Sequence, residues 1–100
     1  MISPATTTTL PPSSRFVRTK GVVSTQQCDT TVLLDVNGGL YYTLNEVGGR
    51  IWEMVGENAS VAEMVERLAG EFDAPAERLE ADTGGMLARL LGASLVERAG

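Results

Sequence analysis

The feature that most constrains the fold is the dipeptide Asn37-Gly38, which lies between two runs of β-prone residues, 30–36 and 39–44. A two-residue type I′ loop needs a positive φ at both central positions, and Asn-Gly tolerates this conformation well. The pattern therefore predicts a β-hairpin. Its second strand leads directly into a helical pattern, so the hairpin and a helix form one continuous unit.

This loop also sets the pairing of the two strands. One face pairs Val36 with Gly39, Leu34 with Tyr41 and Val32 with Thr43, and the other pairs Asp35 with Leu40, Leu33 with Tyr42 and Thr31 with Leu44. Both faces are largely apolar. Because an antiparallel ribbon in a small domain normally buries one face and exposes a polar one, the second apolar face needs its own explanation.

The N-terminal part of the chain divides into a tail and a strand region. Residues 1–14 hold three of the four prolines and four consecutive threonines. Such a segment cannot bury enough apolar surface to offset chain entropy, so we expect a disordered tail, followed by one domain over residues 15–100. Residues 15–25 are predicted to supply a third strand beside the hairpin's first strand, with a polar turn at 26–29. Three strands are about the minimum for independent stability.

Two capped helices are predicted after the hairpin. The Asn45 side chain can accept from the first unpaired amides of a helix. Gly48-Gly49 weakens that helix by about 1 kcal/mol per glycine relative to alanine, but would let it pack close to the sheet. Ser60 and Glu63 have the spacing of a capping box at the start of a second helix.

A third helix is predicted to begin at Pro75 and to end at Gly92. Gly84-Gly85 interrupts its middle, and Asp82 lies in line with its apolar residues. One interpretation is a kinked helix or two short helices, the second capped by Asp82. The other is that the small residues admit a ligand backbone, with the Asp82 carboxylate at the rim. The whole layout is α+β: a three-stranded antiparallel sheet followed by three helices, similar to a winged helix-turn-helix.

The composition excludes several kinds of chemistry. The chain has no histidine and one cysteine, Cys28. This excludes His-based catalysis, a Ser/His/Asp triad, a typical zinc site and a disulfide within the chain. With no histidine to activate its thiol, Cys28 is interpreted as structural. The glycine pairs do not form a nucleotide-binding motif. We therefore predict no enzymatic activity, no metal and no cofactor.

The charge and hydropathy of the chain limit its partners. The net charge is −5 and the eight basic residues are scattered, which argues against nucleic acid, because phosphate contacts supply most of that affinity. A basic peptide fits better. No stretch approaches the ~18 apolar residues of a membrane span, and the N-terminus lacks the features of a signal peptide. We expect a cytoplasmic protein without a membrane partner.

The order of these residues resembles the PqqD-like proteins, also called RiPP precursor recognition elements. Members have an apolar strand ending in Leu-Asp, a glycine, an aromatic strand ending in Leu-Asn, an Ile-Trp pair and a C-terminal leucine pair. The matching residues are Val32-Leu33-Leu34-Asp35, Gly39, Tyr41, Leu44-Asn45, Ile51-Trp52, Ser60-Val61, Leu68, Phe72-Asp73, Asp82 and Leu90 to Val96. The resemblance covers residues 16 to 97. This chain departs from the pattern at Ala93-Ser94, where many members continue directly into Gly-Leu-Val.

Within this family, the chain looks most like the stand-alone B1 proteins of lasso peptide pathways. The resemblance implies a non-catalytic adaptor that binds the leader segment of a ribosomally made precursor peptide and presents it to a separate leader peptidase, the B2 protein. In the family, the leader adds as an antiparallel strand to the third strand, against the third helix. Carried over, the expected peptide-binding residues are Leu40, Tyr41, Tyr42 and Thr43 on the strand, Asp82, Met86, Arg89 and Leu90 on the helix, and Val32 and Leu34 on the second apolar face.

Two alternative functions are compatible with parts of the sequence. A winged-helix DNA-binding regulator is compatible with the fold, because fold alone does not determine function. However, the last two helices carry only Arg67, Arg78 and Arg89, against seven acids between residues 63 and 82. The other alternative is a homodimer formed through the second apolar face.

Overall fold

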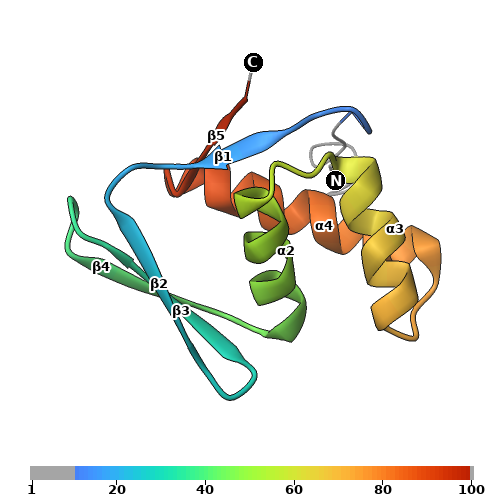
Figure 1. Cartoon of the computed structure of the whole chain (residues 1–100), viewed down its shortest axis with the longest axis horizontal. Helices are drawn as coiled ribbons and strands as arrows, with labels where there is room; N and C mark the ends of the chain where they lie inside the picture. The colour runs from blue at the N-terminus through green and yellow to red at the C-terminus, as the bar shows by residue number, and fades with distance from the viewer. Residues whose placement is uncertain (1–10, 100) are drawn as a thin grey trace, which may run out of the picture.

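The structure is a computed structural model, and it describes residues 11–99. Its elements are, in order, β1 (Phe16–Arg18), β2 (Val22–Gln27), β3 (Thr30–Asp35), β4 (Leu40–Leu44), α2 (Glu46–Gly56), α3 (Val61–Glu71), α4 (Ala76–Gly92) and β5 (Val96–Arg98). Strands β2, β3 and β4 form an antiparallel sheet in that order (Figure 1). The predicted α+β fold, with a three-stranded sheet followed by three helices, is therefore confirmed.

The predicted register of the β3–β4 hairpin is confirmed. Leu34 lies opposite Tyr41 and Val32 lies opposite Thr43. A shift by one residue would exchange the two faces of a strand. The register therefore determines which side chains of β4 point toward the helices and which point away from them.

The predicted turn of this hairpin is wrong. The loop spans residues 36–39, and Gly39 is the residue in it with a positive φ, +70°, so Asn37-Gly38 does not form a type I′ turn. Instead, the Asp35 carboxylate accepts hydrogen bonds from the N–H groups of Asn37 (3.1 Å) and Gly38 (3.2 Å). The Asp35 carbonyl oxygen accepts from the Gly39 N–H at 2.7 Å. The side chain of Asp35 thus closes a longer loop while leaving the register unchanged.

The region predicted as a third strand forms two strands. Residues 22–27 pair with β3, as expected. Before β2 the chain turns at Gly21, whose φ is +89°. The strand that precedes this turn, β1, does not join the sheet but pairs with β5 near the C-terminus. Strand β5 was not predicted, because three residues after a helix give too weak a pattern. The polar turn expected at 26–29 is shorter, since β2 continues to Gln27, and Cys28 is exposed within that turn.

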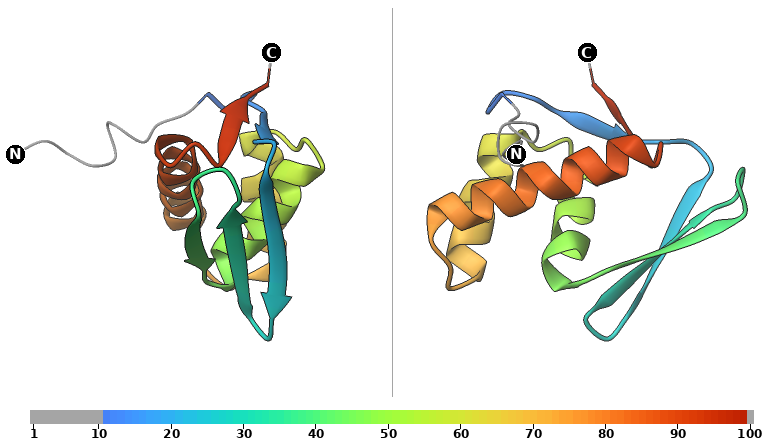
Figure 2. Two further views of the ribbon diagram at one scale, coloured as in Figure 1. Left: turned by 90° about the vertical axis from the view of Figure 1, so that its left-hand side faces the viewer. Right: turned by 180° about the vertical axis from the view of Figure 1, so that it is seen from behind.

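Helix α2 packs on one face of the three-stranded sheet. On this inner face, Thr31, Leu33 and Leu44 are buried, and α2 contacts both β3 and β4. On the outer face, no element of the part of the chain that the structure describes packs against the sheet (Figures 1 and 2). There Val23 is 53 % exposed and Tyr41 is 73 % exposed. The second apolar face is therefore solvent-accessible.

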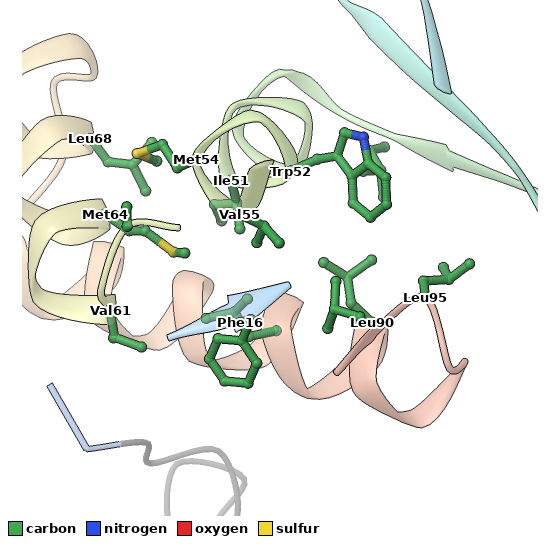
Figure 3. Packing of buried hydrophobic residues seen from close by; sticks show 14 of the residues in the cluster. Phe16, Ile51, Trp52, Met54, Val55, Val61, Met64, Leu68, Leu90 and Leu95 are labelled. Atoms are coloured by element: carbon green, nitrogen blue, oxygen red, sulfur yellow. The ribbon is translucent and has the colours of Figure 1, made fainter. Parts of the chain in front are cut away.

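The main core lies between the helices and the β1–β5 pair. Trp52 is 1 % exposed, as predicted for a core residue, and packs in one cluster with Phe16 of β1 and with Leu95, the residue before β5 (Figure 3). The fully buried side chains also include Ile51, Met54, Met64, Leu68, Leu79, Leu87 and Leu90. Burial of this apolar surface is the dominant stabilising contribution to such a small domain.

Helix α4 is one continuous helix, so both the kinked and the two-helix interpretations are wrong. It runs through Gly84-Gly85 without a break. Thr83 and Gly84 are buried on the packed side of the helix, whereas Gly85 is half-buried and a Cβ on it would meet open space. Asp82 does not cap a helix; its carboxylate lies 3.8 Å from Arg78 in an exposed ion pair.

The predicted caps are confirmed. The Asn45 side-chain oxygen accepts from the Gly48 N–H at 2.8 Å. The Glu63 carboxylate accepts from the Ser60 N–H at 2.7 Å, and the Ser60 hydroxyl accepts from the Glu63 N–H at 3.2 Å, which completes the capping box. Pro75 was expected to be the first helical residue of α4. It occupies the N-cap instead, so the helix begins one residue later, at Ala76.

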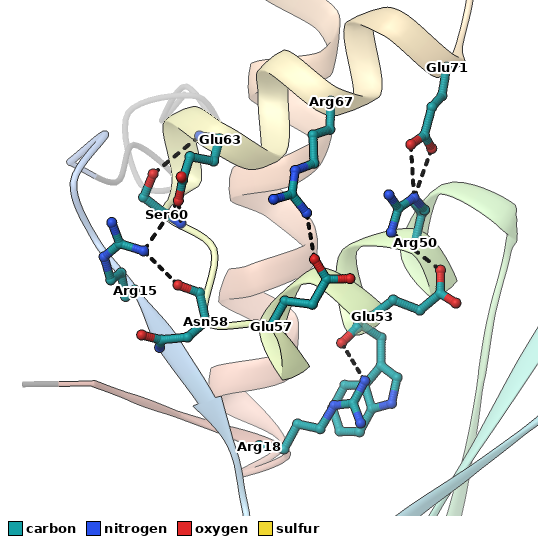
Figure 4. A network of polar contacts seen from close by, with 11 residues as sticks. Arg15, Arg18, Arg50, Glu53, Glu57, Asn58, Ser60, Glu63, Arg67 and Glu71 are labelled. Carbon is teal, nitrogen blue, oxygen red and sulfur yellow. Dashed lines mark hydrogen bonds and ion pairs between the residues drawn. The ribbon is translucent and has the colours of Figure 1, made fainter.

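Arginine side chains connect the elements at the surface (Figure 4). Arg15 donates to the Asn58 carbonyl oxygen (2.6 Å) and lies 3.2 Å from Glu63. Arg18 stacks over the Trp52 ring, 4.6 Å from its centroid, and donates to the Trp52 carbonyl oxygen. The Arg18 stack covers the edge of the core where β1 meets α2.

The segment before β1 is described only from residue 11. The carbonyl oxygens of Pro12 and Ser14 accept hydrogen bonds from the N–H groups of Ala62 and Val61, each at 3.0 Å. Residues 11–14 thus contact the start of α3. The rest of the predicted tail, residues 1–10, lies outside the described residues, and the boundary at residue 14 stays a prediction.

Replacing Gly49 by alanine should destabilise the fold. A Cβ at this position would lie 3.2 Å from Thr31 Cβ and closer still to the Thr31 hydroxyl oxygen. Overpacking of this kind costs about 1–3 kcal/mol, which outweighs the gain of about 1 kcal/mol in helix propensity. The matched control is Gly70→Ala in α3, where a Cβ would meet open space. Urea unfolding should give a lower free energy of unfolding for Gly49→Ala and a higher one for Gly70→Ala. Equal effects would contradict the close contact between α2 and the sheet.

Glu63 should make stability depend on pH. The hydrogen bond from the Ser60 backbone N–H lowers the pKa of the Glu63 carboxyl below its usual 4.5, with further contributions from the Ser60 hydroxyl contact and Arg15. A carboxyl whose pKa is lower in the folded state stabilises the fold above the unfolded pKa, and loses this effect as pH falls through the folded pKa. Glu63→Gln should therefore be less stable than wild type at neutral pH and no less stable in acid, by urea unfolding. Glu66→Gln, which removes the same charge outside the capping box, should show a smaller change with pH.

Candidate functional site

Strand β4 presents an open edge of the sheet. The Val36 N–H donates to the Gly21 carbonyl oxygen at 2.9 Å. The backbone N–H and C=O groups of every second residue of β3, counted back from Val36, therefore point toward β2, and those of the other residues point toward β4. By the same alternation, the backbone of Tyr42 points toward β3. The N–H and C=O groups of Tyr41 and Thr43 point outward, to an edge with which no other described strand pairs. An unpaired edge of this kind is a ready template for another strand.

Helix α4 lies on the β4 side of the sheet, and β2 lies on the far side (Figure 2, left). Helix α4 approaches the end of β4 through the Met86 side chain. A Cβ on Gly48 would lie 2.8 Å from Met86 Cε and 3.2 Å from Leu44 Cβ. The half-buried Met86 side chain therefore lies where the end of β4, the start of α2 and the middle of α4 meet.

The exposed residues of α4 that flank Met86 share its side of the helix. Asp82 precedes Met86 by four residues and Arg89 follows it by three, the spacings that place side chains next to one another on a helix. Both are exposed. Asp82 pairs loosely with Arg78, an exposed ion pair that contributes little to stability. The β4-facing stripe of α4 is thus an apolar centre between one acid and one base.

The structure divides the ten predicted site residues into three groups. Leu40 and Tyr42 share the inner face of β4, and Asp82, Met86 and Arg89 share the facing stripe of α4. Val32, Leu34, Tyr41 and Thr43 lie on the outer face of the sheet, which α4 does not cover. Leu90 is 2 % exposed and is part of the core, so it supports α4 from behind. Of the two tyrosines, Tyr42 is half-buried toward the helices and Tyr41 points away from them.

A separate hollow of about 310 Å³ lies on the β2–β3 side of the inner face, near the β2–β3 turn. It is lined by Gln26, Asp29, Thr31, Glu46, Gly49, Arg50, Glu53, Glu71 and Phe72. Sequence analysis missed it, because its lining comes from four elements distant in the chain. The Arg50 guanidinium donates to Glu71 at 2.8 Å, which raises the pKa of Arg50, and lies 3.5 Å from Glu53. The arginine that lines this hollow, Arg50, is therefore already paired with two of the surrounding carboxylates.

Metal clusters and membrane-spanning helices are both absent from the residues that the structure describes. Residues 11–99 contain no cluster of three or more potential metal ligands. No helix in the same range is long and apolar enough to cross a membrane.

Comparison with known proteins identifies relatives of this fold. The family model for coenzyme PQQ synthesis protein D (PqqD) matches residues 30–96. The solved structure of TbiB1 in complex with the TbiA(beta) leader peptide is 30% identical in sequence, with a TM-score of 0.77, over 84% of this chain and 98% of that chain. A lasso peptide synthetase B1 complexed with the leader peptide has the same fold at 22% identity, with a TM-score of 0.75 over 82% and 96% of the two chains. No curated protein matches the sequence. Because the family model spans more than half of the residues and includes the hairpin, α2, α3 and α4, this chain belongs to the PqqD family.

Proposed function

We propose that this chain is a non-catalytic adaptor that binds the leader segment of a ribosomally synthesised precursor peptide, of the lasso peptide type. The leader adds to β4 as an antiparallel strand, next to α4. The observation that carries the proposal is the open edge of β4, with the outward backbone groups of Tyr41 and Thr43 beside the Met86 stripe. The relatives complexed with leader peptides support it.

The geometry of strand addition explains how such a site would recognise a peptide. Backbone hydrogen bonds supply affinity that is independent of sequence, and alternate side chains supply specificity. Leader side chains on the inner face would contact Tyr42 and Met86, so this site favours apolar residues at every second position. The net charge of −5 would speed encounter with a basic leader.

The bound leader would then be presented to a separate leader peptidase of the B2 type, in the cytoplasm. The resemblance to the family implies this division of labour, and the similarity to B1 proteins complexed with leader peptides supports its leader-binding part. A strand held along β4 is extended and fixed in register, which is a suitable state for delivery to an enzyme that cuts beyond it.

A homodimer through the outer face is the second candidate. The exposed Val23 and Tyr41 side chains favour it, since exposed apolar patches mark interaction surfaces. Sedimentation at micromolar concentration would show a species of twice the monomer mass. DNA binding is disfavoured, because the exposed residues of α4 include Glu77, Glu80 and Asp82, which would repel phosphates.

Removing one outward N–H from β4 should abolish most of the leader binding. Thr43→Pro deletes a donor that strand addition requires. The matched control is Ser24→Pro on β2, the other edge strand, whose N–H also points away from β3 by the alternation described above. We expect Thr43→Pro to weaken binding of a labelled leader by at least about tenfold, or ~1.4 kcal/mol, and Ser24→Pro to leave it unchanged, by fluorescence anisotropy. Circular dichroism would confirm that both variants fold.

A charge at the centre of the α4 stripe should also weaken binding. Met86→Glu would bury a carboxylate without a partner when the peptide covers it, a penalty of several kcal/mol before relaxation. Ala81→Glu adds the same charge at an exposed position of the same helix. Isothermal titration with the leader, and with a scrambled leader, should show a loss of at least about tenfold for Met86→Glu alone. Wild-type affinity for Met86→Glu would exclude α4 as a wall of the groove.

A further inference from the structure

The exposed large apolar side chains gather at one end of the three-stranded sheet. Of the five such residues among those described, four lie there: Val23 (53 % exposed), Val36 (60 %), Leu40 (56 %) and Tyr41 (73 %). Val23 and Tyr41 flank Leu34 in one row across the outer face. Val36 and Leu40 belong to the β3–β4 loop and its border. Leu40 belongs to the inner face with Tyr42, so we call the other three residues, Val23, Val36 and Tyr41, the loop-end patch.

The two ends of the sheet differ in character. The opposite end, around the β2–β3 turn, carries Gln26, Gln27, Asp29 and Thr30. None of the three patch residues is charged, on a protein of net charge −5. The nearby Asp35 carboxylate accepts from two N–H groups of the loop, so it is held against the backbone. The exposed Lys20 borders this end of the sheet, and its carbonyl oxygen accepts from the Asn37 side chain at 3.2 Å. The loop-end patch is thus an apolar area, bordered by one base, on a molecule of net negative charge.

The direction of β4 determines which end of the sheet the precursor would leave. This step rests on the proposed function. Strand β4 runs from Leu40 at the loop end to Leu44 at the start of α2. A leader antiparallel to it would enter beside Leu44 and leave beside Leu40. Since a leader precedes the segment to be released, the bond to be cut would emerge next to the loop-end patch.

We propose that the loop-end patch is the docking surface for the leader peptidase, which would contact it through an apolar surface next to its substrate cleft. Docking here would place the enzyme where the peptide leaves the sheet. Docking at the polar end would place the enzyme where the leader enters the sheet, at the other end of the bound strand.

The size of the patch indicates that docking depends on the leader. Stable interfaces involve roughly 20–30 residues a side, and three side chains fall well short of this. An added leader strand would extend the outer face beyond Tyr41, so the peptidase would contact adaptor and leader together and would bind the empty adaptor weakly.

The test separates leader binding from docking. Val36→Asp and Val23→Asp place a charge in the patch, and neither residue belongs to the proposed groove. Thr25→Asp places the same charge on β2, on the same face as Val23 but nearer the polar end. Each variant is titrated with the leader peptide encoded nearest to the gene. Each is then added to the full precursor and the peptidase encoded beside it, and kcat/KM for leader removal is measured.

We expect all three variants to bind the leader as the wild type does. Val36→Asp and Val23→Asp should lower the adaptor-dependent kcat/KM by at least tenfold, and Thr25→Asp should leave it within twofold. Wild-type kcat/KM with Val36→Asp and Val23→Asp would overturn the docking proposal while leaving the adaptor function intact. An absence of leader binding by the wild-type protein would instead overturn the proposed function, and the docking surface with it.

Discussion

The arrangement of this protein depends on the close approach of α2 to the inner face of the sheet. Gly49 lies against Thr31 of β3, and Gly48 lies beneath Met86 and beside Leu44. A side chain at either position would push the helix away from the strands. Two glycines in the first turns of a helix reduce its intrinsic stability, and here this loss is offset by contacts that only a bare backbone can make.

This contact also determines which surfaces remain open. With α2 seated on the inner face near the end of β4, helix α4 reaches the sheet through the Met86 side chain at the same point. The edge of β4 and the whole outer face are then left uncovered among the described residues. A free edge strand is a liability that most proteins protect. In a protein whose ligand is an extended peptide, the same edge is the binding element.

The two faces of β4 have different roles in this interpretation. The inner side chains, Leu40 and Tyr42, lie toward the helices and would read the peptide. The outer ones lie in a row that reaches across to Val23 and would remain exposed after the peptide binds. Because side chains alternate along a strand, the five-residue strand β4 can serve one ligand at its edge and another on its outer face. The −5 net charge would then act on encounter, and the uncharged loop-end patch on docking.

Local patterns in the sequence were sufficient for several parts of the fold. The alternation of apolar residues predicted the register of Leu34 with Tyr41, and side-chain chemistry predicted the caps at Asn45 and Ser60, because these features depend on near neighbours in the chain. The motif order also predicted the family.

Only the tertiary structure decided the rest. The β1–β5 pairing joins segments about eighty residues apart, and the continuity of α4 through Gly84-Gly85 depends on the packing around it. The core position of Leu90, the opposite directions of Tyr41 and Tyr42 relative to α4, and the gathering of Val23 and Val36 at one end of the sheet depend on which surfaces the helices cover, and no local pattern contains that information.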